Sequence, residues 1–413
     1  MNGSGPDKVL IFGIDSPIGL TLIRELGQHG VTVYGIGQSR RAIGLYSRYL
    51  EKAYVFSGSR QQLIPFVSQI ASRQRIAYLL TVAENDILFF NQHRHELENL
   101  KFLFADTVSL SIVLDKEKTC ALAREVGIDT PFSFSIKTIE ELDKVRQHIQ
   151  YPVILKWRNP SDIVPLLSPY HIPFLKTEYC YNVDSLYSSL NRYVAVGQFP
   201  LLQSFCPGYG LGQMIFMHNK EPLLIFQHRR LHEWPPEGGV SSLCESLAPT
   251  EHRPLLEKSI ELLRRIGWEG AAMVEYRFDP VTQQAVLMEI NGRFWGSLPL
   301  AYHANASFAW YTYSVLGKGI VPSAHPYRAG LRCLYLVPEL KRLAVILFRP
   351  DLIQNKALHF NKFKELFGLL GTFFNPRQKY YIFCLRDPWP AVMDGYYIVL
   401  KGLSALRARL FQP

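Results

Sequence analysis

The chain has 413 residues, of which 48% are hydrophobic, so it can build two or three domains with sizeable cores. Its six cysteines show no CxxC spacing, which argues against a zinc ribbon or a disulfide framework and fits a reducing cytosol. The net charge at pH 7 is +10, and most of it lies in residues 331–413, which hold 13 Lys/Arg against 5 Asp/Glu. Because no signal peptide and no convincing membrane span are visible, we expect a soluble cytoplasmic protein.

The first part of the chain, residues 1–112, alternates apolar strands with amphipathic helices. Residues 8–14, the glycine turn that follows, a helix and the strand VTVYGIG form a Rossmann-like β-α-β unit. The glycine spacing is GxxxxxG and not GxGxxG, so the evidence for a dinucleotide is weak. The alternation continues through a strand at 76–82 and a helix over 85–100, which predicts a small parallel α/β domain. Glu84 ends a strand, where such sheets bind ligands, or is a helix N-terminal acid.

One lysine stands out in the next part of the chain. Asp115 opens a helix that contains Lys116, a strand at 132–136 and a helix over 139–150 follow, and YPVILK then forms an apolar strand that ends in Lys156. A lysine in a buried strand is costly unless it meets an anion, which favours phosphate contact for Lys156. Lys116 fits the same role or an ordinary surface position. Four prolines and no glycine in residues 157–175 predict a long irregular loop.

Three strands follow, over residues 198–205, 212–217 and 222–234, and the last of them carries Arg230. The turn at residues 235–242 contains two glycines and offers backbone N–H groups that could cradle an anion; a plain loop is the alternative. A helix over residues 250–266 leads into the most informative stretch of the sequence.

Residues 271–297 predict a β-hairpin with two carboxylates and one amide on the same face. Period-2 alternation places Glu275 on one strand and Glu289 with Asn291 on the other, and a symmetric turn would set the two glutamates opposite each other. Mg²⁺ prefers one or two protein carboxylates plus phosphate oxygens, so the hairpin predicts half of a metal–nucleotide site. Arg293 follows as a fixed cation for a phosphoryl or carboxylate group. The alternative is a surface hairpin with solvated acids.

The order of these pieces resembles the ATP-grasp superfamily over about residues 8–325. DK…T before a helix that ends in GIDTP, the YPVILK strand, QSFCPG and MVEYRFD…LMEINGRFWGS are similar to its successive motifs. Together with HRRLHEWPPEGGVSS, they look most like the carbamoyl-phosphate-synthase-like carboxylate-amine ligases. The resemblance implies a mixed α/β and α+β protein in four parts: a Rossmann-like pre-ATP-grasp domain (1–112), two ATP-grasp lobes (113–195 and 196–325), and a basic, aromatic C-terminal extension (326–413).

The resemblance also implies roles for single residues. Lys116 and Lys156 would contact the phosphates of ATP, and Glu275, Glu289 and Asn291 would bind Mg²⁺ or Mn²⁺. The backbone around Gln203, Ser204, Phe205 and Cys206 would contact the adenine. Arg293 and Arg230 would steady the acceptor carboxylate or the phosphoryl group. The carboxylate substrate would be bound by Gly238, Gly239, Val240 and Ser241. Two departures from the family are Ser204, where a glutamate is usual, and prolines in place of the usual glycine-rich phosphate loop.

The implied reaction is ATP-dependent formation of an amide from a small-molecule carboxylate and an amine, through an acyl phosphate. A small-molecule kinase on the same fold and a non-catalytic nucleotide-binding protein are the alternatives, and an NAD oxidoreductase is disfavoured by the missing phosphate fingerprint. No nucleic-acid partner is expected.

The end of the chain has an interfacial-helix pattern, with apolar residues at helical spacing and cations between them: Leu400, Leu403, Leu406 and Leu410, with Lys401, Arg407 and Arg409. Packing of this basic tail onto the body of the protein is the favoured interpretation, and peripheral membrane contact is the other.

Overall fold

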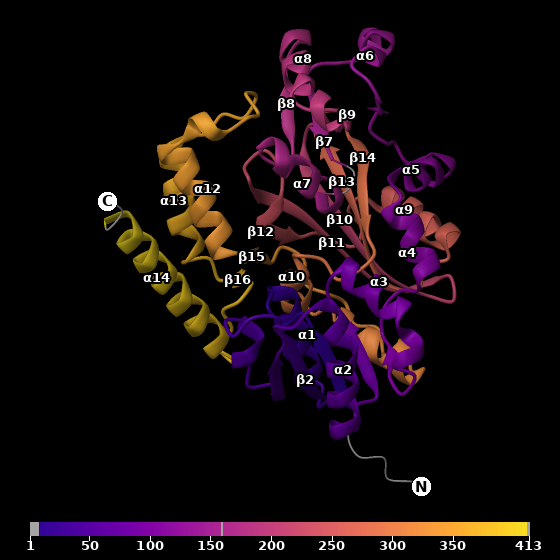
Figure 1. Cartoon of the computed structure of the whole chain (residues 1–413). Helices are drawn as coiled ribbons and strands as arrows, with labels where there is room; N and C mark the ends of the chain where they lie inside the picture. Colours follow the sequence, from indigo (N-terminus) through magenta and orange to yellow (C-terminus); the bar gives the residue numbers. More distant parts are fainter. Residues whose placement is uncertain (1–7, 158–159, 411–413) are drawn as a thin grey trace.

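The computed structural model describes residues 8–157 and 160–410, without the side chains of residues 160–162, 403 and 405–410. Its first sheet has five parallel strands in the order β3-β2-β1-β4-β5, with helices packed against it (Figure 1). The elements are β1 (Lys8–Phe12), α1 (Pro17–Gln28), β2 (Thr32–Gly37), β3 (Leu50–Val55), α2 (Arg60–Gln74), β4 (Tyr78–Thr81), α3 (Glu84–Gln92) and β5 (Lys101–Phe102).

Strand β1 shows why this sheet is covered on both faces. Val9 and Ile11 belong to one hydrophobic cluster, and Leu10 and Phe12 belong to another, because successive side chains of a strand point to opposite faces. All four side chains are fully buried. Helix α3 ends at Gln92, so the helix predicted over 85–100 is shorter than expected, and a 3₁₀ turn follows it.

The second sheet has four strands in the order β6-β9-β7-β8 and forms the small lobe at the top of Figure 1. The irregular loop predicted over 157–175 is wrong in part: residues 158–159 lie outside the described residues, but a helix and a 3₁₀ turn follow them. The helix predicted over 139–150 is also shorter. The elements of this region are α4 (Thr107–Leu114), α5 (Lys116–Glu125), β6 (Ser133–Phe134), α6 (Glu141–Val145), β7 (Val153–Lys156), α7 (Pro160–Leu167), β8 (Glu178–Cys180), α8 (Val183–Asn191) and β9 (Leu201–Ser204).

The third and largest sheet has seven strands in the order β14-β13-β10-β11-β12-β15-β16. Helices α4, α5 and α9 contribute to the hydrophobic cluster on one of its faces, and residues of the first domain share the cluster on the other. Its elements are β10 (Tyr209–His218), β11 (Glu221–Trp234), β12 (Val240–Ser246), α9 (Arg253–Ile266), β13 (Gly270–Asp279), β14 (Gln284–Asn291), β15 (Arg332–Leu334) and β16 (Gln378–Tyr380).

Helices α10 (Leu298–His303) and α11 (Phe308–Tyr311) follow the hairpin and pack against α1. Phe308 and Ala309 are fully buried in the cluster that includes β1. The chain that leaves the large sheet therefore returns to the first domain and joins the two into one core.

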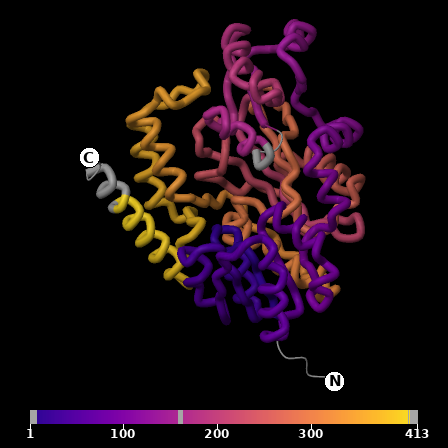
Figure 2. The backbone as a smooth tube through the Cα atoms, in the orientation of Figure 1, coloured from indigo at the N-terminus to yellow at the C-terminus, as the bar shows by residue number. Residues whose placement is uncertain are grey.

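The C-terminal extension adds β15 and β16 to the large sheet and three helices beside it, α12 (Leu336–Phe348), α13 (Lys362–Thr372) and α14 (Trp389–Leu410). Helix α12 packs on β11 and β12, and α14 runs past the first domain at residues 43–46. The orange-to-yellow tube in Figure 2 shows the three helices gathered on one side of the molecule. Among the described residues, no helix combines the length and the apolar character needed to cross a membrane.

Candidate nucleotide and metal site

The β13–β14 hairpin places its two glutamates opposite each other. Glu275 pairs with Glu289, and Met273 pairs with Asn291, as the alternation predicts. The hairpin reaches this pairing without the symmetric turn that we expected. Asp279 pairs with Gln284 across the turn, and a register shift between Glu275 and Tyr276 leaves Met288 without a partner. This β-bulge brings Glu289 into line with Glu275, so it creates the pairing instead of spoiling it.

Glu289 lies in a strongly positive environment. The Glu289 side chain reaches the surface, and the protein around it raises its pKa by desolvation. The charges of Lys116, Lys156 and Arg230 and a hydrogen bond from Asn291 outweigh this effect and hold the pKa below its ordinary value. In that bond the Asn291 Nδ2 atom donates to Glu289 Oε1 at 3.3 Å. The Glu289 carboxylate is therefore held in its charged form, as a metal ligand must be.

Lys156 stands at the end of β7 and faces the hairpin. Burial lowers the pKa of Lys156, the positive charge of Lys116 lowers it further, and Glu289 and Glu275 oppose both effects. The fold thus brings the two lysines predicted to bind phosphate close to the two glutamates predicted to bind metal. The lysines lie on α5 and β7, and the glutamates lie on the large sheet.

Arg230 is tied into an ion network that the sequence did not show. Its guanidinium group contacts Glu275 at 2.5 Å and Glu233 at 3.1 Å, and Glu233 also contacts Arg277 at 2.8 Å. Burial and repulsion from Glu289 raise the pKa of Glu275, whereas Arg230 counteracts the rise. Arg230 therefore orients the Glu275 carboxylate. Arg277 shares a strand face with Glu275, which period-2 alternation could have revealed.

Arg293 joins the hairpin to the first domain. Its Nε atom lies 3.5 Å from Glu84 Oε1, and it donates a hydrogen bond to the backbone oxygen of Phe294. Glu84 is the first residue of α3. Burial raises the pKa of Glu84, Arg293 lowers it, and Glu289 raises it. Glu84 therefore belongs to the same electrostatic cluster, although its position in the sequence left this open.

The pairing of β9 with β7 shows which residues lie on each face of the small-lobe sheet. Gln203 pairs with Ile154 and Ser204 pairs with Val153, so Ser204 lies on the face opposite Lys156. The Ser204 hydroxyl accepts a hydrogen bond from the backbone N–H of Phe132 at 3.1 Å. The serine that replaces the usual glutamate therefore points away from the lysine face and fastens β6 to β9.

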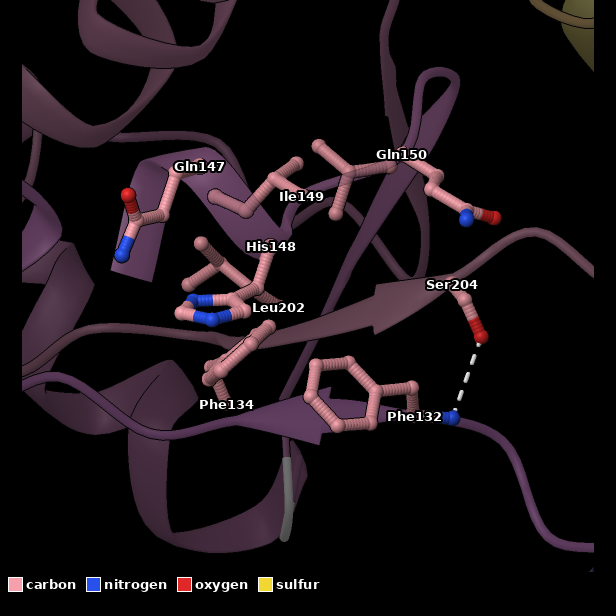
Figure 3. Close-up of a pocket in the computed structure, with 9 residues that line it drawn as sticks. Phe132, Phe134, Gln147, His148, Ile149, Gln150, Leu202 and Ser204 are labelled. Carbon is pink, nitrogen blue, oxygen red and sulfur yellow. Dashed lines mark hydrogen bonds between the residues drawn. The ribbon is translucent and has the colours of Figure 1, made fainter. Parts of the chain in front are cut away.

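A cavity of about 410 Å³ lies on this far face, between β6, β9 and the residues that follow α6. Figure 3 shows Phe134, His148 and Leu202 side by side along it, with Ser204 and its bond to Phe132 at one end. The cavity is thus separated from Lys156 by the sheet and is distinct from the predicted phosphate site.

The turn predicted to bind the carboxylate substrate is shorter than expected. Val240 and Ser241 are already part of β12 and pair with Trp234 and Glu233, which corrects the turn predicted through residue 242. Gly239 remains in the turn, and its carbonyl oxygen accepts a hydrogen bond from Arg230. The turn is therefore fixed to the residue that orients Glu275.

The donor set of the hairpin fits Mg²⁺. Glu275, Glu289 and Asn291 offer oxygen atoms only, and Mg²⁺ takes one or two protein carboxylates and fills its other positions with phosphate or water. The described residues hold no group of three or more His, Cys, Asp or Glu side chains that could bind a metal unaided.

Known proteins match the region of the hairpin. Residues 241–306 match the family model described as carbamoyl-phosphate synthase L chain, ATP binding domain. The carbamoyl phosphate synthase large chain of Paenarthrobacter aurescens is 22% identical over 322 residues, which are 73% of this chain and 27% of that protein. The chain therefore matches about a quarter of the length of this curated relative.

Solved structures extend the likeness to most of the chain. The biotin carboxylase–β,γ-ATP complex of Campylobacter jejuni matches with a TM-score of 0.61 and 15% identity, over 80% of this chain and 75% of that one. The N5-carboxyaminoimidazole synthetase of Staphylococcus aureus in complex with ADP matches with a TM-score of 0.59 and 13% identity, over 80% and 82%. At such identities the likeness shows the fold alone, and this fold agrees with the one that the resemblance in the sequence implies.

Proposed function

Given the ATP-grasp fold, we propose that this chain is an ATP- and Mg²⁺-dependent carboxylate-amine ligase that forms an amide through an acyl phosphate. One observation supports the proposal above all. Glu275 and Glu289 face each other on one hairpin, and the charges of Lys116 and Lys156 interact with Glu289. Carboxylates on one side and lysines on the other form a site for a metal-bound polyphosphate.

In the proposed reaction, an oxygen of the substrate carboxylate forms a bond to the γ-phosphorus of ATP. The bond between that phosphorus and the β–γ bridging oxygen breaks, and ADP leaves. An amine then attacks the carbonyl carbon of the acyl phosphate, phosphate departs with the electron pair of the C–O bond, and the amine loses a proton. Positive charge near the phosphates stabilises both steps because negative charge gathers on their oxygens.

The residues divide this work between them. Lys116 and Lys156 bind the phosphate oxygens. Glu275, Glu289 and Asn291 would hold Mg²⁺, which supplies further positive charge against those oxygens. Arg293 lies beside the hairpin, where it can steady the phosphoryl group or the acceptor carboxylate, and Arg230 acts through Glu275, which it positions.

The first prediction tests this proposal by ADP release from ATP with a panel of carboxylates and amines. We expect release that requires both a carboxylate and an amine. Glu289→Gln should lower it by about a hundredfold or more, because one charged metal ligand is lost from the phosphate site. Glu257→Gln is the matched control, since Glu257 is an exposed residue of α9 that pairs with Arg253.

Two results would contradict the ligase, and a third would contradict the metal assignment. A stable phosphorylated product that forms without any amine would indicate a kinase. Tight ATP binding without turnover on any acceptor would indicate a non-catalytic protein. Equal ADP release by the wild type and Glu289→Gln would remove the metal assignment.

A further inference from the structure

Helix α13 turns its apolar face to solvent. Phe363, Phe367 and Phe374 have 74%, 65% and 88% of their surface exposed, and Leu370 between them has 49% exposed. Their spacing places them on one face of a helix and the turn after it. Leu369 is the one residue of α13 that is buried. In a globular protein such a stripe normally faces the core, so this helix is oriented the opposite way.

Helix α14 continues the pattern. Trp389, Val392, Tyr396 and Val399 recur at helical spacing with 61%, 53%, 53% and 60% of their surface exposed. Leu385, just before the helix, is 85% exposed. Helices α13 and α14 lie on the same side of the molecule (Figure 1). Both carry exposed aromatic and aliphatic side chains. Large apolar surfaces exposed on soluble proteins commonly mark sites that bind a partner or a membrane.

The charge around these faces is positive. The region from residue 331 onward carries a net charge of +8. Two of its five acids, Glu339 and Asp387, are buried, which leaves little negative charge at the surface. Within the described part of the chain, the exposed Lys364 and Lys401 form no ion pair with a carboxylate. The side chains of Leu403, Leu406, Leu410, Arg407 and Arg409 lie outside the described residues.

We propose that the C-terminal extension docks on an anionic lipid surface, with the exposed faces of α13 and α14 entering the headgroup boundary and the lysines meeting the lipid phosphates. Apolar side chains beside cations are the features by which interfacial helices bind membranes. A second copy of the chain fits less well. A symmetric dimer would set this positively charged patch of one copy against the same patch of the other.

The proposal is tested by vesicle flotation of the full chain. We expect binding to vesicles of equimolar phosphatidylcholine and phosphatidylglycerol, weaker binding to phosphatidylcholine alone, and loss of the difference in about 1 M salt. The variant F363S/F367S/F374S should bind about tenfold more weakly or worse, since three phenylalanines no longer enter the interface. The matched control is V108S/V194S/V281S, which alters exposed valines outside the extension.

Absence of wild-type binding to the anionic vesicles, or equal binding by the phenylalanine variant, would overturn the proposal. Light scattering decides the rival occupant: a wild-type dimer that the phenylalanine substitutions convert to monomer, without vesicle binding, assigns the face to a second copy. Thermal unfolding of both triple variants near the wild-type temperature shows that exposed side chains, and not the fold, were changed.

Discussion

A buried carboxyl group in the first helix links the stability of the protein to pH. Glu25 of α1 is 2% exposed, and its Oε1 atom accepts a hydrogen bond from the backbone N–H of Trp310 at 2.8 Å. Burial raises the pKa of Glu25 from its ordinary 4.5 to about 8. The folded protein therefore keeps a proton that the unfolded chain releases above about pH 4.5. This stabilisation is complete below that pH and is lost as the pH rises through about 8.

The second prediction follows from this loss of stability as the pH rises. Between about pH 6.5 and 8 the free energy of unfolding should fall with rising pH, by at most about 1.4 kcal/mol per unit from this group. Glu25→Gln should remove that slope in urea unfolding, with Glu257→Gln as control. Burial lowers the pKa of His228 to about 3 and of His303 to about 4. Titration of these two histidines therefore changes the stability only below about pH 6.5, the ordinary pKa of histidine. An unchanged slope in Glu25→Gln would contradict the prediction.

The sequence predicted several residues of the site but not their partners. Lys156 was found because a lysine in an apolar strand needs an anion, and Glu289 was found because alternation sets it opposite Glu275. Alternation along β13 puts Arg277 on the face of Glu275, but its ion pair with Glu233 was missed because that pair depends on how separate strands are arranged in the sheet. The substrate and metal roles of these residues stay predictions.

Among the elements, the segment after α12 connects the small lobe to the large sheet. The Tyr181 hydroxyl donates to the backbone oxygen of Gln354 at 3.0 Å and accepts from the backbone N–H of Lys356 at 2.7 Å. Gln354 also donates its backbone N–H to Glu237 Oε1 at 3.3 Å, in the turn between β11 and β12. The extension thus holds β8 beside the turn that is predicted to bind substrate.

The third prediction removes this link. Tyr181→Phe loses both hydrogen bonds of the hydroxyl, so the backbone amide of Lys356 should exchange hydrogen about tenfold faster in native-state exchange measured by mass spectrometry or NMR. Tyr187→Phe is the matched control, because its hydroxyl binds Asp143 within the small lobe. Unchanged exchange at Lys356 in Tyr181→Phe would show that the segment is held by other contacts.

Elements with a strong period were predictable, and elements that depend on distant partners were not. The hairpin alternates clearly, whereas the bulge at Met288 depends on how the turn closes. Strand β12 contains three serines and is stabilised by β15 from the extension, which no local pattern shows. Helix α7 contains two prolines: Pro160 occupies its first position, where a missing N–H costs little, whereas Pro165 lies inside the helix, which the local sequence did not predict.

At the scale of the whole molecule, a buried ion pair connects the first helix to the C-terminal extension. Arg24 is 1% exposed and Asp387 is not exposed at all. The Arg24 Nε atom donates to Asp387 Oδ2 at 3.0 Å, and a second guanidinium nitrogen donates to the Asp387 backbone oxygen at 2.8 Å. Asp387 also accepts hydrogen bonds from Ser47 and from the backbone of Arg48. The extension is therefore part of the folded body.

The fourth prediction concerns this pair. Asp387→Asn leaves the Arg24 charge buried without a counter-charge and should lower the free energy of unfolding by about 3 kcal/mol in urea. The matched control is Asp351→Asn, which breaks the exposed pair with Arg349 and should change stability little. Equal effects of the two substitutions would show that the buried pair contributes no more than a surface pair.

The same pair has a consequence for the order in which the protein is made. Arg24 and Asp387 are 363 positions apart, so at about 5 to 20 residues per second a ribosome needs roughly 20 to 70 seconds to supply the second after the first. During that time the first domain holds an arginine without its counter-ion. We expect the first domain to remain incompletely folded until Asp387 has been synthesised and can pair with Arg24.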